Sequence, residues 1–306
     1  MSLDPRPDDP ADDPRKPGSS ERVRARRIGP SPRTTIETLA VEAPLQIRME
    51  HAGRPLTELV TMRTPGADLD LAAGWLIGEG VVRGPQDVVS IRPCIDDTLT
   101  AEERGNVVTV DLRTDAAARA ATIQRTTDVS SACGVCGSAT LHSLHERGLT
   151  PVTSSATIDT DVVVRLPDLM RERQRVFTRT GGLHAAGVFT LDGDPRWVRE
   201  DVGRHNAVDK VLGAALISEA TPLRDHALVV TSRASFEILQ KAVAAGVPVV
   251  VAISAPSTLA VDVADQFGIT LVGFVREGRA TVYTHPKRVT EPEASEGTGD
   301  PDGSSS

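Results

Sequence analysis

The chain has 306 residues, of which 39% are hydrophobic, 25% charged and only 3% aromatic, and its formal net charge is −8. This length is enough for one large domain or two modest ones. The negative charge argues against non-specific nucleic-acid binding, which needs a basic surface. The chain has no apolar run long enough to cross a membrane, and its N-terminus lacks the apolar segment of a signal peptide. We therefore expect a globular cytoplasmic protein that binds neither nucleic acid nor membrane.

Both ends of the chain have the composition of unfolded segments. Residues 1–32 contain seven of the 21 prolines and almost no large apolar side chains. Residues 287–306 end in GTGDPDGSSS. Segments of low hydrophobicity cannot bury enough apolar surface to offset the entropy lost on folding. We predict disordered tails over 1–32 and 287–306.

The first folded part, residues 33–125, combines short strands with one clear helix. The segment LDLAAGWLIGEG, residues 69–80, predicts a helix, and Asp68 is expected to cap its N-terminus. Strands are predicted over Thr35–Ala40, Leu45–Met49, Leu59–Arg63, Val88–Arg92 and Val107–Leu112. This part is therefore predicted to be a small α+β unit.

In residues 141–286, strands and helices alternate along the chain. Strands are expected over 186–191, 197–199, 227–232, 248–254, 269–275 and 280–283, and helices over 204–216, 235–245 and 257–267. The run Leu228–Val230 is apolar on consecutive residues, which is typical of strands covered on both faces. The pattern predicts an α/β fold with a three-layer α/β/α domain at this end of the chain.

Two of the three cysteines stand close together in SSACGVCGSAT, residues 130–140. A glycine follows each cysteine and the surroundings are polar, which predicts a mobile loop over residues 126–140. A C-x-x-C pair can exchange a disulfide, carry sulfur as a persulfide or share a metal. Its reactive form is the thiolate. The exposed setting favours a sulfur carrier, in which one of Cys133 and Cys136 accepts the sulfur and the other assists.

Other types of C-x-x-C site fit the sequence less well. A thioredoxin-like dithiol site follows a strand and opens a long helix, whereas here a polar segment precedes the pair. A structural zinc site usually takes four ligands, and only Cys94 remains. The cytidine-deaminase signature needs a glutamate where Ala186 stands, two residues after His184. We predict no structural metal, and a zinc-dependent hydrolase stays the weaker alternative.

Several basic and hydroxyl side chains stand where predicted strands lead into helices. In open α/β sheets, ligands collect at the carboxyl ends of the strands. Helix N-termini and arginines bind phosphates there. The pattern predicts a polyphosphate or dinucleotide ligand, although the usual glycine-rich phosphate motifs are absent. The candidate binding residues are His184, Arg204, His205, Ser232, Arg233, Phe274, Arg276 and Arg279.

Six blocks resemble, in order and spacing, the FdhD family of formate dehydrogenase accessory sulfurtransferases: CGVCG, TGGLHAA, EDVGRHNAVDK, SRASFE, SAPSTLAVDVA and LVGFVREGRATVYTH. The resemblance covers roughly residues 35–286. It implies a homodimer with a cytidine-deaminase-like core that lacks the deaminase zinc chemistry. It also implies that the protein receives sulfur from a cysteine desulfurase as a persulfide. The sulfur would pass to the molybdenum (or tungsten) bis-guanine-dinucleotide cofactor, Mo-bis(molybdopterin guanine dinucleotide), which formate dehydrogenase needs in sulfurated form.

The resemblance also assigns residues. It places the persulfide on Cys133, with Cys136 assisting. It maps the cofactor-binding stretch, for which GDP would be a mimic, onto Phe274, Val275, Arg276, Glu277, Gly278 and Arg279. Apart from the zinc-dependent hydrolase, a non-catalytic chaperone that binds the cofactor stays open as an alternative.

Overall fold

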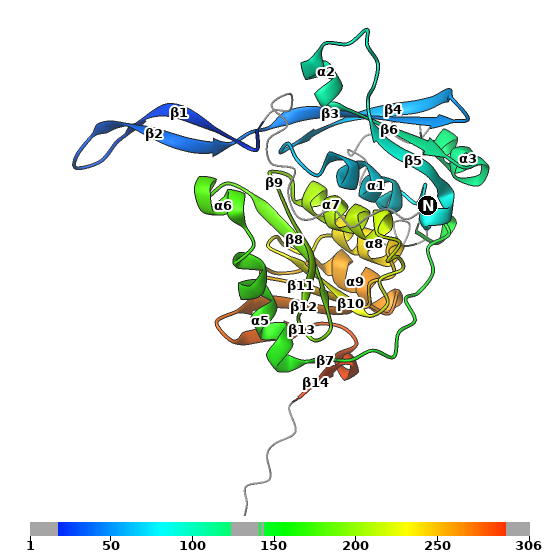
Figure 1. The fold of residues 1–306 in the computed structure, drawn as a ribbon. Helices are drawn as coiled ribbons and strands as arrows, with labels where there is room; N and C mark the ends of the chain where they lie inside the picture. The colour runs from blue at the N-terminus through cyan, green and yellow to red at the C-terminus, as the bar shows by residue number, and fades with distance from the viewer. Residues whose placement is uncertain (1–17, 124–140, 142–143, 292–306) are drawn as a thin grey trace, which may run out of the picture.

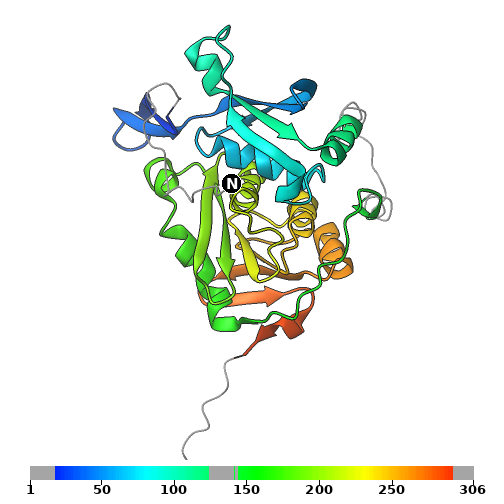
Figure 2. The same cartoon turned by 45° about the vertical axis from the view of Figure 1, so that its right-hand side comes forward.

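A computed structural model describes residues 18–123, 141 and 144–291. Two sheets lie one above the other, with helices packed between them (Figures 1 and 2). The mixed α/β character expected from the sequence is confirmed. Among the described residues, no helix has the length and apolar character needed to span a membrane.

The upper sheet of Figure 1 has four strands in the order β4-β3-β6-β5. Their bounds are β3 Ala43–His51, β4 Arg54–Arg63, β5 Val88–Pro93 and β6 Val107–Leu112. Leu45, Ile47 and Met49 of β3 are buried, as expected for a strand with one covered face. Helix α1, Asp68–Gly78, covers that face. The strands and the helix predicted in this part are confirmed, whereas α2, Ala101–Gly105, and α3, Thr114–Ile123, were not predicted.

Helix α1 begins differently from the prediction. The residue at its N-cap is Ala67, which has a left-handed φ of 52°, and no side chain caps the helix. Asp68 is instead the first helical residue, and its carboxylate lies 2.9 Å from the buried Arg63 guanidinium. Asp68 therefore acts as the counter-ion of a buried arginine, because the buried ion pair outweighs the capping preference.

The lower sheet has six strands in the order β13-β12-β11-β10-β8-β9. Strands β10, β11 and β12 are parallel, whereas β8, β9 and β13 are antiparallel to their neighbours. The bounds are β8 His184–Thr190, β9 Pro195–Asp201, β10 His226–Val230, β11 Val249–Ala252, β12 Thr270–Arg276 and β13 Arg279–Val282. These strands agree with the predicted ones to within a few residues.

Helices cover both faces of this six-stranded sheet. Leu228 and Val250 pack on the side of α7 (Arg204–Ile217), α8 (Phe236–Ala244) and α9 (Thr258–Gln266). Val229 and Val251 pack on the opposite side, against α5 (Thr160–Arg171). The expectation that consecutive apolar residues mark strands buried on both faces is confirmed. Neither α5 nor the short α6, Arg175–Thr180, was predicted. Helix α5 was missed because it contains Pro167, a residue that usually ends or kinks a helix.

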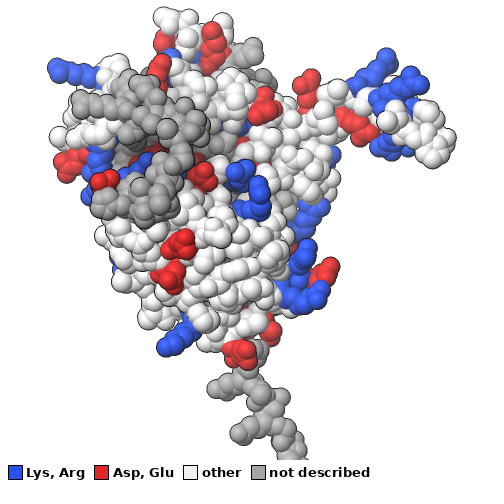
Figure 3. Space-filling model, turned by 180° about the vertical axis from the view of Figure 1, so that it is seen from behind, with Lys and Arg blue, Asp and Glu red and all other residues white. Residues whose placement is uncertain are grey.

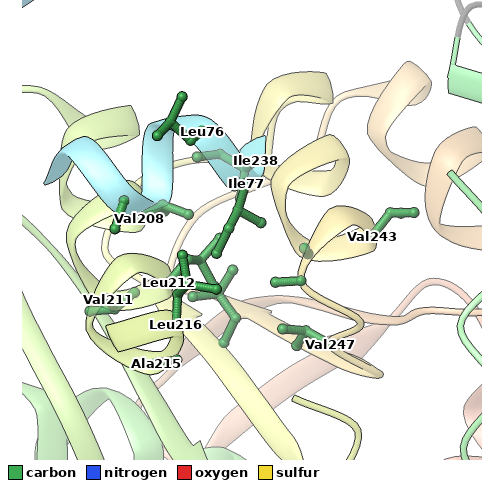
Figure 4. Close-up of a cluster of buried hydrophobic side chains, with 14 of the residues drawn as sticks. Leu76, Ile77, Val208, Val211, Leu212, Ala215, Leu216, Ile238, Val243 and Val247 are labelled. Atoms are coloured by element: carbon green, nitrogen blue, oxygen red, sulfur yellow. The ribbon is translucent and has the colours of Figure 1, made fainter. Parts of the chain in front are cut away.

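The two parts of the chain share one core. Leu76 and Ile77 of α1 belong to the same buried cluster as Val208 and Leu212 of α7 and Ile238 of α8 (Figure 4). The contact between α1 and α7 depends on two glycines. A Cβ at Gly74 would lie 1.7 Å from the Asp209 carbonyl oxygen, and one at Gly213 would lie 1.8 Å from that of Asp70. The helices therefore cross at a distance that no larger residue permits.

The structure differs from the sequence prediction at both ends. Residues 20–27, placed by the prediction in a disordered leader, form β1 (Ser20–Arg27). Strand β1 pairs antiparallel with β2 (Arg33–Ala40) in an arm that extends from the body (Figure 1). Figure 3 shows basic side chains gathered on this arm. In-register main-chain pairing compensates for the lack of apolar residues in β1.

At the other end, β14 (Val289–Thr290), expected in the second tail, pairs parallel with β7 (Ile158–Asp159). This pairing was not predicted because its two strands are very short and lie far apart in the sequence. Residues 1–17 and 292–306, like the whole predicted cysteine loop over residues 126–140, lie outside the described part of the chain.

Candidate functional site

The predicted binding residues converge on the carboxyl edge of the six-stranded sheet, where the parallel strands β10 and β11 end. Because β8 is antiparallel to β10, its first residue, His184, lies at the same edge. His184 pairs with Asp201 of β9, so the start of α7 is also close. The β12–β13 turn follows the end of β12. Topology thus brings together segments that are up to 95 residues apart in the sequence, from His184 to Arg279.

His184 lies beside the first residue after β10. Its Nδ1 atom is 3.4 Å from the Thr231 hydroxyl, and the side chain is half-buried. Burial lowers the pKa of His184, and the nearby Arg204 and His205 lower it further. Near neutral pH, His184 is therefore an uncharged donor or acceptor within a basic cluster.

His205 faces a carboxylate that the sequence analysis did not identify. Its Nε2 atom is buried without a hydrogen-bond partner in the described structure and lies 3.6 Å from Glu237 Oε2. The Ser235 hydroxyl donates to the same carboxylate oxygen at 2.8 Å. The interaction with His205 and the hydrogen bond from Ser235 lower the pKa of Glu237 to about 2, although burial by itself would raise it. Glu237 thus lies where it can orient the His205 ring.

A buried network holds the loop that presents Arg204 and His205. One Asp201 carboxylate oxygen accepts hydrogen bonds from the Gly203 main chain at 2.8 Å and from the Asn206 side chain at 3.2 Å. The other oxygen lies 2.7 Å from Lys210 Nζ and accepts from the Thr64 main chain at 3.1 Å. The start of α7 is therefore attached to the loop between β4 and α1. Apart from Thr64, these residues lie in the block EDVGRHNAVDK, but spacing alone did not indicate their mutual contacts.

Ser232 and Arg233 differ in their availability to a ligand. Ser232 is buried, and its hydroxyl donates to the Arg233 carbonyl at 3.0 Å, so it stabilises the turn before α8. The Arg233 side chain is exposed, and no described residue pairs with it. Of the two, Arg233 is free to bind an anion.

The stretch 274–279 forms an irregular turn between β12 and β13. Phe274, which is 40% exposed, has a left-handed φ of 53°, and its main-chain N–H donates to the Ser254 carbonyl at 3.3 Å. Val275 is fully buried on the α5 side of the sheet, so only its main chain can face a ligand. Glu277 and Gly278 also have positive φ angles, of 52° and 71°. These conformations are uncommon for non-glycine residues and often occur at functional turns.

Two arginines stand opposite each other in this turn. Arg276 and Arg279 are paired across the strands and both are exposed. Glu277 lies 2.9 Å from Arg279, whereas no described acidic residue pairs with Arg276. Like charges directly opposite each other are unfavourable without a counter-ion. Together with Arg204 and Arg233, this turn gives the carboxyl edge an excess of positive charge suited to phosphate groups.

Cys133 and Cys136 lie outside the described residues, so their predicted role stays a prediction. The described cysteine is Cys94, which is half-buried, and its sulfur accepts a hydrogen bond from the Asp96 main chain. No group of three or more His, Cys, Asp or Glu side chains arranged to hold a metal is found among the described residues.

The model of the FdhD/NarQ family matches residues 40–290. The chain belongs to this family. The resemblance of the six sequence blocks is therefore confirmed. Relatives from Mycobacterium bovis and Nocardia farcinica, both named "Sulfur carrier protein FdhD", are each 46% identical to the chain. The alignments cover 84% and 83% of this chain, and 93% and 88% of the respective relatives.

The FdhD/NarQ match extends to more distant relatives and to a solved structure. A protein of the same name from Picrophilus torridus is 38% identical over 86% of the chain and 95% of its own length. A crystal structure described as a formate dehydrogenase accessory protein from Desulfotalea psychrophila superposes with a TM-score of 0.68. It is 22% identical to the chain, and the match covers 89% of this chain and 99% of that one. This similarity supports the fold.

Proposed function

We propose that this FdhD/NarQ-family chain is a sulfurtransferase that carries sulfur as a cysteine persulfide and is required for formate dehydrogenase activity. The observation that carries the proposal is the match, over 84% of the chain, to relatives named sulfur carrier proteins. Two thiols in the sequence CGVCG and a basic sheet edge support it, because they offer a sulfur carrier and an anion site in one molecule.

Sulfur uptake is a thiolate displacement. The Cys133 thiolate attacks the outer sulfur of a persulfide on a cysteine desulfurase. A new S–S bond forms at Cys133, the S–S bond of the donor breaks, and the donor cysteine leaves as a thiolate. No net oxidation or reduction occurs in this step. A cysteine with a lowered pKa is favoured as the acceptor because more of it is thiolate at neutral pH.

Sulfur release needs two electrons if the sulfur is delivered as sulfide. The Cys136 thiolate attacks Cys133 Sγ, a Cys133–Cys136 disulfide forms, and the terminal sulfur leaves with the electron pair of the broken bond. The two cysteines thus supply the two electrons, and a cellular dithiol must then reduce the disulfide. This step gives Cys136 its assisting role.

The acceptor in this proposal is the molybdenum or tungsten bis-guanine-dinucleotide cofactor, bound as a substrate before its insertion into formate dehydrogenase. The basic carboxyl edge fits its charge, because Arg204, Arg233 and Arg276 can each donate to phosphate oxygens. Phe274 offers an exposed ring against which a guanine can stack. A homodimer with a cytidine-deaminase-like arrangement of layers belongs to the same proposal.

Mass spectrometry tests the carrier step directly. After incubation with a cysteine desulfurase and cysteine, the Cys133 peptide should gain one sulfur, about 32 Da, as expected for persulfidation. Cys133→Ala should gain none there and should fail to activate formate dehydrogenase while still binding GDP. Full activation by Cys133→Ala would overturn the proposal. No adduct on the unmodified protein would favour a non-catalytic chaperone, and one zinc per chain, lost in Cys133→Ser, would favour a hydrolase.

A further inference from the structure

A separate cleft lies at the opposite, amino edge of the six-stranded sheet. It has a volume of about 520 Å³ and is formed by two segments, residues 154–157 and residues 285–288. The first segment leads into β7, and the second contains a 3-10 turn, Pro286–Arg288, that leads into β14. In Figure 1 these elements lie at the bottom of the molecule, far from the arm. The cleft has the size of a small-molecule site.

Arg288 forms one wall of this cleft and is held rigidly. Its guanidinium donates to the Thr270 hydroxyl at 2.6 Å, to the Pro248 carbonyl at 3.4 Å and to the Ser154 carbonyl at 3.3 Å. Every one of these acceptors is neutral, and no described acidic side chain pairs with Arg288. Partial burial lowers the pKa of Arg288, since water is excluded from the cation. The hydrogen bonds therefore fix the position of a charge that nothing in contact neutralises.

Lys287, on the same turn, adds a second positive charge. Its side chain is exposed, and no described carboxylate lies within ion-pair distance. Asp265 of α9 lies close to the neighbouring His285: its carboxylate is 3.7 Å from His285 Nε2, and its main-chain carbonyl oxygen is 3.0 Å from the same atom. Asp265 is thus engaged with the imidazole, on the α9 side of the cleft. The net charge of the described cleft lining is positive.

The facing segment supplies hydroxyl groups from a constrained turn. Ser154 Oγ donates to the Arg224 carbonyl at 2.9 Å and accepts from the Ala156 main chain at 3.1 Å. Ser155 and Thr157 also line the cleft, and their hydroxyl groups form no hydrogen bond with other described residues. A fixed arginine and an exposed lysine opposite hydroxyl groups suit a ligand with several negatively charged oxygens.

We propose that this cleft binds a phosphorylated small molecule, with Lys287 and Arg288 neutralising the phosphate charge. A tetrahedral phosphate accepts from guanidinium, ammonium and hydroxyl donors at once, whereas a single carboxylate is planar and carries one charge. The site is independent of the sulfur-transfer site, since it lies at the other edge of the sheet. It therefore stands whether or not the chain carries sulfur.

Isothermal titration calorimetry with inorganic pyrophosphate tests the proposal on the full-length chain. Lys287→Glu, a change at an exposed residue, should weaken binding at least about tenfold, because it reverses one of the two charges. Arg54→Glu makes the same charge change at an exposed residue of the four-stranded sheet and should alter the affinity less than about twofold. Ser155→Ala with Thr157→Ala should weaken binding less than Lys287→Glu does.

Three results would overturn the assignment. The first is no detectable pyrophosphate binding by the unmodified chain. The second is a loss of binding in Arg233→Glu with none in Lys287→Glu, which would place pyrophosphate at the carboxyl edge. The third is equal affinity for citrate and pyrophosphate, which would show that the cleft does not select phosphate. Persulfide formation on Cys133, measured on the same samples, distinguishes these failures from a failure of the sulfur-carrier proposal.

Discussion

Basic side chains are used in opposite ways in two regions of this molecule. Where α1 meets α7 and α8, they are buried and paired with acids, as in Lys210 with Asp201 and Lys241 with Asp209, both at 2.7 Å. At the carboxyl edge of the six-stranded sheet, Arg204, Arg233 and Arg276 lie at least partly exposed, with no acidic partner among the described residues. The same kind of charge therefore holds two parts of the chain together in one region and stays available to a ligand in the other.

The difference follows from the cost of burial. A buried cation without a counter-ion costs several kcal/mol, so each lysine at the helix interface requires a carboxylate in contact. An exposed arginine is hydrated, and leaving it unpaired costs little. Unpaired cations at the sheet edge are therefore compatible with stability, and substitutions can separate the two roles.

The largest effect is expected from breaking a buried pair. Lys241→Met should lower the free energy of unfolding by about 3–5 kcal/mol, because the Asp209 carboxylate would stay buried without its partner. Replacing both residues, Asp209→Leu with Lys241→Met, should recover much of the loss. Lys287→Met, at an exposed residue, serves as the control and should change stability by less than about 0.5 kcal/mol. Urea denaturation measures all three, and an equal loss in the single and double variants would contradict the argument.

The next effect concerns the helix crossing. Gly213→Ala should destabilise the protein by about 1–3 kcal/mol, although alanine favours helices, because its Cβ would collide with the Asp70 carbonyl. Gly182→Ala places its Cβ 4.0 Å from the nearest atom and should be nearly neutral. Thermal unfolding compares the two, and a stable Gly213→Ala variant would show that α1 and α7 can move apart at little cost.

At the sheet edge, substitutions should affect binding and leave stability unchanged. Arg233→Ala and Arg276→Ala should each weaken GDP binding about tenfold, equivalent to about 1.4 kcal/mol. Their free energies of unfolding should change by less than about 0.5 kcal/mol, because neither side chain has a described partner. Arg54→Ala, an exposed change on the other sheet, is the matched control. Calorimetry would contradict the proposed site if Arg54→Ala weakened binding as much as Arg233→Ala.

The smallest effect is a pH dependence of stability. The pKa of His184 is lowered in the folded state, first by burial, so the unfolded chain binds this proton more readily. Stability should therefore fall as the pH drops through about 6.5, the unfolded-state pKa, and be regained above it. His184→Asn should reduce this fall by less than about 1 kcal/mol, since the half-exposed ring is screened by water. His226, whose pKa burial also lowers, accounts for part of the remaining slope. A slope in denaturation experiments between pH 5 and 7 that His184→Asn leaves unchanged would contradict this assignment.

The sequence by itself determined most of the local elements and predicted the kind of site. Consecutive apolar residues such as Leu228–Val230 can only be buried on both faces, which indicated a helix-covered sheet before any contact was known. Basic residues at strand-to-helix turns indicated an anion site, because strand direction brings such turns to one edge. These conclusions depend on neighbours along the chain and therefore needed no tertiary structure.

Only the tertiary structure decided which side chains meet. The pairing of Asp201 with Lys210 and Thr64 and the approach of Glu237 to His205 depend on how elements pack. The same applies to Val275. It lies within the predicted binding stretch, but its side chain is buried in the core. Strand β1 forms because β2 offers it a partner, although its composition alone predicts disorder. Contacts between distant segments decide which strands pair, which acids neutralise buried cations and where a side chain points at an irregular turn. Local sequence patterns do not encode these contacts.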